Sequence, residues 1–149
     1  MGAAAIYDSN PEFCADIIAN CVRSVERVIC NYYPEGAWME GTGYWHYATT
    51  YCVNLMATLE SVVGTDFNLS KTKGFENTGM YSVETEGPNG TIGEHDSGTS
   101  KMTPYCNMYL AGKFNDPGLG AFKIHSLKKN NVVPPAVDLI WYKEEFDNP

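Results

Sequence analysis

The chain has 149 residues, of which 44% are hydrophobic and 19% are charged, a composition typical of one globular domain and not of a disordered chain. Its 10 basic and 18 acidic side chains give a formal net charge of -8, which argues against a nucleic-acid partner because phosphate binding needs a basic face. No stretch approaches the roughly 20 apolar residues of a membrane span, and the five Cys include no CxxC pair that would indicate a zinc site. We therefore expect no nucleic acid, no membrane partner, no metal and no other cofactor.

The first long helix is predicted from Pro11 to an end between Asn31 and Tyr33. Pro11 suits the first helical position, and Glu12 places an acid in the first turn. Pro34 limits the helix at its other end, because the residue before a proline disfavours helical geometry. Apolar residues recur at steps of four and three, as in an amphipathic helix: Cys14, Ile18, Cys21, Val25 and Val28.

A second helix is predicted from about Gly43 to Val63, with Gly64 as its C-terminal stop. Two helices joined by a loop of this kind form an antiparallel pair, the repeating unit of bundles and helical solenoids. One broad face of the second helix carries Tyr44, Tyr47, Tyr51 and Leu55.

The rest of the chain is predicted as shorter helices with irregular joints. The expected helices cover residues 71–82, with interruptions at Gly74 and Gly79, and residues 102–114, 115–128 and 136–146. The Gly-containing segment 84–98 is expected to be an exposed loop or hairpin. No strand alternation and no repeat of fixed period stand out. The predicted fold class is mostly α, in a single domain spanning residues 1–149.

The loop between the two long helices is the candidate site. Residues 32–47, here called the aromatic segment, hold two Trp, four Tyr, one His, two Glu and three Gly. Rings stack on flat or sugar-like ligands, phenols and imidazoles move protons, and glycines let a backbone approach a ligand closely. A plain helix–helix connection does not need this mixture.

The aromatic segment contains the run YPEGAWMEGTGYWHY, from Tyr33 to Tyr47. This run resembles the heparinase II/III-like polysaccharide lyases, whose toroid domain carries a stretch of the form Y-P-[DE]-G-x-x-x-E-G-[PT]-G-Y-W-x-Y. The similarity extends roughly from Asp8 to Leu119 and includes residues 64–67, 74–75 and 113–119.

The resemblance implies helical hairpins forming part of an incomplete α/α toroid, and β-elimination on an acidic polysaccharide that contains uronic acid, such as heparin, heparan sulfate or alginate. It also implies a periplasmic or secreted location in bacteria. In such lyases a base removes the C5 proton, an Asn or His neutralises the carboxylate, and a Tyr protonates the leaving 4-oxygen. The family's Asn/His motif and its downstream β-sandwich have no counterpart in these residues. The chain is therefore expected to be a fragment of a larger lyase, inactive alone.

Carried over by position, the catalytic tyrosine corresponds to Tyr44, with Tyr47 one turn later as the alternative. A tyrosine, with an ordinary pKa of about 10, serves as a base only where nearby cations or donors favour the phenolate. Structural roles stay open for all of these residues, and His46 points about 160° away from Tyr44 if the segment is helical. The implied substrate-binding residues are Trp38, Glu40, Trp45 and His46.

Other sites and functions compete with this interpretation. Glu94-His95-Asp96 offers acid and imidazole groups in one loop, although adjacent residues seldom point at one ion. A helical-hairpin glycoside hydrolase would need two carboxylates, for which Glu40 and Asp96 are the available pair. A third possibility is a non-catalytic carbohydrate- or partner-binding domain, and exposed toroid faces would allow a homo-oligomer. Lysines that would face an anionic chain, or simply solvent, are Lys71, Lys73, Lys123, Lys128 and Lys129.

Overall fold

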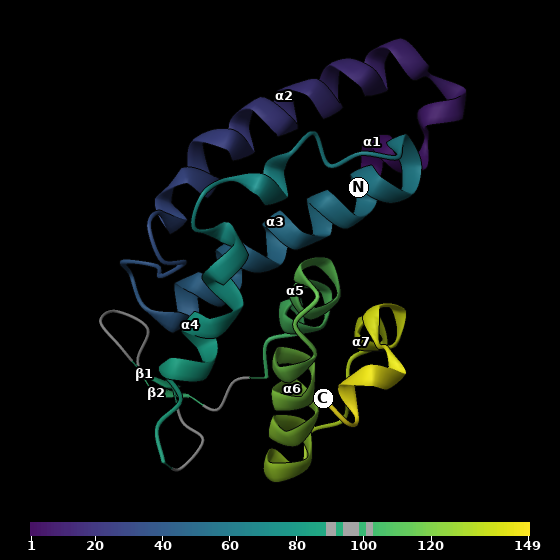
Figure 1. Cartoon of the computed structure of the whole chain (residues 1–149). Helices are drawn as coiled ribbons and strands as arrows, with labels where there is room; N and C mark the ends of the chain where they lie inside the picture. Colours follow the sequence, from purple (N-terminus) through teal and green to yellow (C-terminus); the bar gives the residue numbers. More distant parts are fainter. Residues whose placement is uncertain (89–91, 94–98, 101–102) are drawn as a thin grey trace.

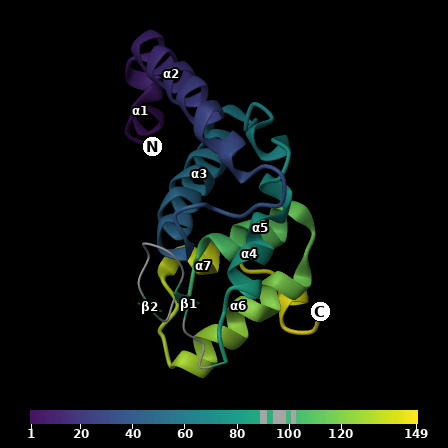
Figure 2. The same ribbon diagram turned by 90° about the vertical axis from the view of Figure 1, so that its left-hand side faces the viewer.

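The computed structural model describes residues 1–88, 92–93, 99–100 and 103–149, and confirms that the fold is mostly α. The N-terminal helices α1 (Gly2–Ala5) and α2 (Pro11–Ile29) form one end of the molecule, and the C-terminal helices form the other. The long helix α3 (Thr42–Val63) runs between the two ends (Figures 1 and 2). No helix in the described ranges has the length and apolarity needed to cross a membrane.

Helix α2 begins at Pro11, as predicted, with Glu12 in its first turn and Arg27 in its last. Its α-helical part ends at Ile29, slightly earlier than expected, and a 3-10 turn (Cys30–Tyr32) completes it. The chain becomes extended at Tyr33, directly before Pro34, which is the conformation that a following proline favours.

Helix α3 ends at Gly64, which adopts a left-handed conformation with φ of 79° and donates its N–H to the carbonyls of Leu59 and Glu60. The core face of α3 is not the face that carries the tyrosines. The face with the tyrosines lies at the surface, and the opposite side fills the core with Trp45, Cys52, Val53, Met56 and Leu59.

The chain returns from α3 through two 3-10 turns, η3 (Leu69–Lys71) and η4 (Phe75–Asn77), before α4 (Thr78–Glu84). The helix expected over residues 71–82 therefore begins only at Thr78. Gly74 explains the delay, because its φ of 93° breaks helical geometry and a side chain there would lie 2.4 Å from the Tyr32 carbonyl oxygen.

Two short strands, β1 (Ile92–Gly93) and β2 (Thr99–Ser100), pair antiparallel, with Ile92 opposite Ser100 and Gly93 opposite Thr99. The described parts of the 84–98 segment thus agree with the expected hairpin.

The C-terminal helices are α5 (Cys106–Phe114), α6 (Pro117–Asn130) and α7 (Ala136–Trp141), followed by the 3-10 turn η6 (Glu144–Phe146). Asp116 caps α6 by accepting the Leu119 N–H at 3.1 Å. The helix expected over residues 136–146 is broken at Tyr142, whose backbone is extended. Helices α5 and α6 pack on each other, and α5 packs on α3, so one core joins both halves of the molecule.

Candidate functional site

The aromatic segment is folded tightly onto the start of α4. Gly36 has a φ of 87°, and a Cβ at this position would lie 2.5 Å from the Thr78 backbone nitrogen. The Thr78 hydroxyl donates to the Gly36 carbonyl at 2.8 Å and accepts the indole N–H of Trp45 at 2.7 Å. One hydroxyl therefore fixes both the loop and the first turn of α3.

Tyr32 is a structural residue of this segment. Its ring is fully buried, lies 5.0 Å from the Trp38 ring and 5.1 Å from that of Phe75, and its hydroxyl shares a 2.8 Å hydrogen bond with Thr49. Burial, and secondarily Cys52, raise the pKa of Tyr32 far above its usual value. Tyr32 therefore stays neutral and supports the loop.

Trp38 and Glu40 lie together at the surface of the loop. The half-buried Trp38 donates its indole N–H to Glu40 Oε2 at 3.1 Å, and its carbonyl accepts the Tyr81 hydroxyl at 3.2 Å. The ring of Trp38 also packs against the hydrophobic core. Glu40 stays exposed and orients the indole of Trp38 at the surface.

Three tyrosines form an exposed stripe on α3, here called the tyrosine face. Tyr44, Tyr47 and Tyr51 are 48%, 65% and 57% exposed. The rings of Tyr47 and Tyr51 meet at 4.9 Å with planes 61° apart. Tyr51 was not among the predicted site residues, although its spacing of four and seven residues from the other two gave the signal.

Trp45 and His46 do not share this exposure. Trp45 is fully buried and bonded to Thr78, so its ring is a core element and offers no surface to a ligand. His46 is half-buried, with its Nε2 atom inaccessible and its ring edge-on to Tyr105 at 6.0 Å. The indole of Trp45 and the Nε2 atom of His46 therefore do not reach the surface, unlike the ring of Tyr44.

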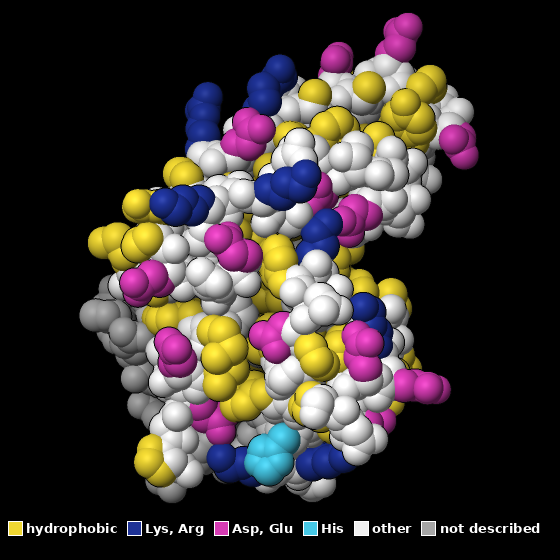
Figure 3. All heavy atoms as spheres, viewed as in Figure 1, with side chains coloured by type: hydrophobic (Ala, Val, Ile, Leu, Met, Phe, Trp, Pro, Cys, Tyr) yellow, Lys and Arg dark blue, Asp and Glu magenta, His cyan; other side chains and the backbone are white. Residues whose placement is uncertain are grey.

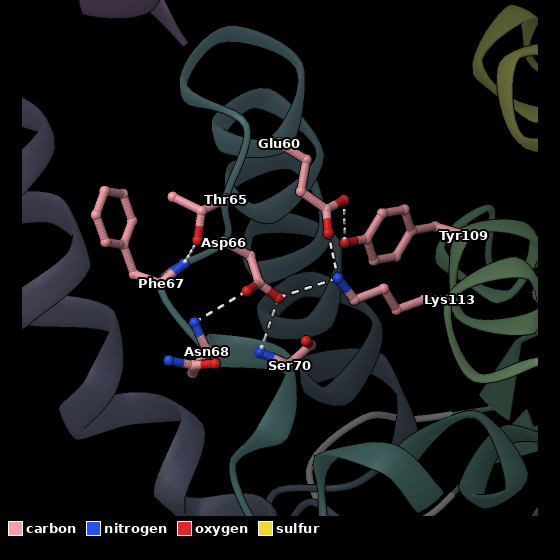
Figure 4. A network of polar contacts seen from close by, with 8 residues as sticks. All are labelled: Glu60, Thr65, Asp66, Phe67, Asn68, Ser70, Tyr109 and Lys113. Atoms are coloured by element: carbon pink, nitrogen blue, oxygen red, sulfur yellow. Dashed lines mark hydrogen bonds and ion pairs between the residues drawn. The ribbon is translucent and has the colours of Figure 1, made fainter.

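A network of charged groups at the other end of α3 was not predicted. Lys113 on α5 is held between Glu60 on α3 and Asp66 on the return segment, and Tyr109 donates to Glu60 at 3.0 Å (Figure 4). Asp66 also accepts the backbone N–H groups of Asn68 and Ser70, at 2.9 and 3.3 Å. We call Glu60, Asp66, Tyr109 and Lys113 the charged clamp.

Electrostatics indicate that the charged clamp is structural. Partial burial alone would raise the pKa of Asp66, but the hydrogen bonds from Ser70 and Lys113 outweigh it and keep this pKa below its usual value. The adjacent polar pocket has a volume of about 580 Å³. The clamp carboxylates already accept hydrogen bonds from groups of the protein itself, which supports a structural role. Glu60 and Lys113 are 53 residues apart, so no local pattern announces the pair.

The lysines separate into different environments. Lys123 is fully buried and forms an ion pair with Asp138 at 3.3 Å, so it is neither a solvated helix end nor a surface contact for an anionic chain. Lys129 pairs with Glu86 at 2.9 Å, and Lys73 lies 4.9 Å from the centre of the Tyr33 ring. Basic and acidic side chains are interspersed on the face seen in Figure 3.

The competing sites fall mainly outside the described residues. Glu94-His95-Asp96 lies there, and so does Asp96 as the partner that a hydrolase would need for Glu40. Within the described ranges, no group of three His, Cys, Asp or Glu is placed to hold a metal ion.

The sequence matches no model of a protein family. No curated protein matches it either.

Proposed function

We propose that this chain is part of a polysaccharide lyase that cleaves a polysaccharide containing uronic acid, of the heparin/heparan or alginate type, by β-elimination. Two observations support the proposal. The run from Tyr33 to Tyr47 resembles the toroid motif of heparinase II/III-like lyases, and the tyrosine assigned by that resemblance is exposed on α3. The helical hairpins would then form part of an incomplete α/α toroid within a larger protein.

The exposure of Tyr44 is the observation that carries the proposal. A phenol can protonate the leaving 4-oxygen of the sugar only if its hydroxyl reaches the substrate, and Tyr44 lies at the surface in the first turn of α3. Tyr47, one turn later and more exposed, is the alternative acid or base. The donors that neutralise the uronate carboxylate would come from other parts of the protein.

The tyrosine face would position the polysaccharide. Tyr44 and Tyr51 are seven residues apart, which is about 10 Å along a helix axis. A row of rings of this length suits consecutive sugars of an extended chain, because aromatic faces stack on the apolar sides of sugar rings. Trp38, oriented by Glu40 beside the start of α3, would add a further contact.

A non-catalytic carbohydrate-binding domain is the second candidate. One observation favours it: Tyr47 and Tyr51 pack edge to face at 4.9 Å, and this contact sets two exposed rings side by side without a catalytic partner of either hydroxyl among the described residues. Both candidates use the tyrosine face, and they differ in whether a product forms.

Ultraviolet absorbance of the product distinguishes them, because only elimination creates a conjugated unsaturated uronate. The assay uses the complete polypeptide that carries this chain, with heparin, heparan sulfate and alginate as substrates. Tyr44→Phe should abolish turnover while binding is largely kept. Tyr7→Phe, which changes an exposed tyrosine on the N-terminal turn η1 (Tyr7–Ser9), is the matched control and should keep full activity.

The outcomes are distinct. Cleavage without ultraviolet-absorbing product would refute the lyase proposal in favour of hydrolysis. Binding without any product would favour the carbohydrate-binding domain. Full activity of Tyr44→Phe would remove Tyr44 from the mechanism, and loss of activity in Tyr47→Phe would then assign the role to Tyr47.

A further inference from the structure

A row of buried polar atoms lies along one side of α3. Thr42 Oγ1, His46 Nε2 and Thr50 Oγ1 are each inaccessible to solvent and have no hydrogen-bond partner among the described residues. Their spacing of four residues places them on one helix face. Because buried polar groups in proteins are nearly always paired, this row calls for an explanation.

His46, the middle member of this row, contacts the C-terminal half of the molecule. The His46 ring packs edge-on against Tyr105, directly before α5, with 6.0 Å between ring centres. Lys123 on α6 is close enough to act electrostatically on His46, and is itself buried. Lys123 donates to the Thr103 carbonyl and forms an ion pair with Asp138 on α7 at 3.3 Å.

The charges at this contact between α3 and the C-terminal helices, here called the joint, disfavour protonation of His46. Burial lowers the pKa of His46, and the positive charge of Lys123 lowers it further. The one acid among the described groups around it, Asp138, is already paired with Lys123, and burial raises the pKa of Asp138. Burial also raises the pKa of Cys106, the first residue of α5, to about 12, so the neutral thiol supplies no compensating charge.

We propose that His46 is a pH-dependent lock between α3 and the C-terminal helices. The neutral imidazole packs on Tyr105 and closes the joint. When Nε2 takes up a proton from solvent, the imidazolium is buried and is repelled by the Lys123 cation, so it leaves its packing position and the joint loosens. The lock does not depend on whether the tyrosine face binds a polysaccharide.

The direction of the pH effect follows from linkage. The folded chain binds the proton on His46 more weakly than the unfolded chain does, whose His pKa is about 6.5. The stabilisation by the neutral imidazole is therefore fully present above about pH 6.5, and it is lost as the pH falls from there through the lower pKa of the folded state.

Tryptophan fluorescence and an NMR titration test the lock on the 149-residue chain. Trp45 is the neighbour of His46, and Trp141 stacks on Tyr105 at 6.3 Å, so both report on the joint. We expect a reversible fluorescence change as the pH is lowered from neutral to mildly acidic, in the wild type and in His125→Gln, which removes an exposed imidazole from α6. His46→Gln should lack this change.

The same change in His46→Gln, or none in the wild type, would overturn the proposal. The NMR titration needs no variant and decides the matter if His46→Gln does not fold. A His46 imidazole that titrates in the folded chain at or above the ordinary value of about 6.5 would overturn the lock. The double variant Lys123→Met/Asp138→Asn, which removes the opposing cation and its partner, should shift the midpoint to higher pH; an unchanged midpoint would remove Lys123 from the lock.

Discussion

The charged clamp offers the most direct test of how α3 is held to α5. Lys113→Met keeps the aliphatic stem and removes the ammonium group that joins Glu60 and Asp66. The variant leaves Asp66, whose side chain is only 10% exposed, without its cation, while Glu60 at 33% exposure recovers part of its hydration.

The free energy of unfolding lost in Lys113→Met lies between two limits. An exposed ion pair contributes about 0–1 kcal/mol, and a hydrogen bond to a charged, partly buried group about 1.5–3 kcal/mol. Because Asp66 is nearly buried and Lys113 is 24% exposed, we expect Lys113→Met to lower the free energy of unfolding by about 2 kcal/mol. For a chain of 149 residues this corresponds to a fall in Tm of about 4–8 °C.

Urea unfolding followed by circular dichroism measures the effect, with an unchanged m-value as evidence that only stability has changed. Lys128→Met is the matched control, since Lys128 is exposed on α6 and should change stability by less than about 0.5 kcal/mol. A double-mutant cycle with Asp66→Asn should show positive coupling between the two sites. Equal stabilities of Lys113→Met and Lys128→Met would refute the inference that the charged clamp holds α3 to α5.

Two further predictions concern stability. The pKa of Asp66 is held below its usual value, so its contribution is present above about pH 4 and is lost as the pH falls through the folded pKa; Asp66→Asn should flatten the acid limb of a plot of unfolding free energy against pH, and an unchanged limb would contradict this role. Gly64→Ala should cost about 1–2 kcal/mol, because its φ of 79° is strained for alanine but its Cβ would meet nothing within 4 Å. Gly36→Ala should cost at least about 1 kcal/mol more, because its Cβ would also collide with the Thr78 backbone. Equal costs in thermal unfolding would argue against that collision.

Local chemistry made the long helices predictable. Pro11 and Gly64 mark the ends of α2 and α3 through backbone preferences that act within a few residues. The sequence marks Gly74 as an interruption before α4, but the approach of its backbone to Tyr32 is a distant contact that no local pattern shows.

The candidate site was predictable in part because helical periodicity, too, is a local property of the sequence. Helical spacing places Tyr44 and Tyr47 on one face, and the structure exposes both. Spacing alone does not say which face of α3 meets the core, so the burial of Trp45 could not be read from the sequence. That burial depends on Thr78, which lies 33 residues away.

The tyrosine face and the charged clamp lie on the same helix, and their separation determines how substitutions in the two places combine. The tyrosine face occupies the first turns of α3, and Glu60 of the charged clamp lies 16 residues beyond Tyr44, about 24 Å along the axis. Substitutions so far apart, with no shared neighbours, add independently. Substitutions on the tyrosine face can therefore accumulate at one end of α3 while the other end keeps the helix anchored.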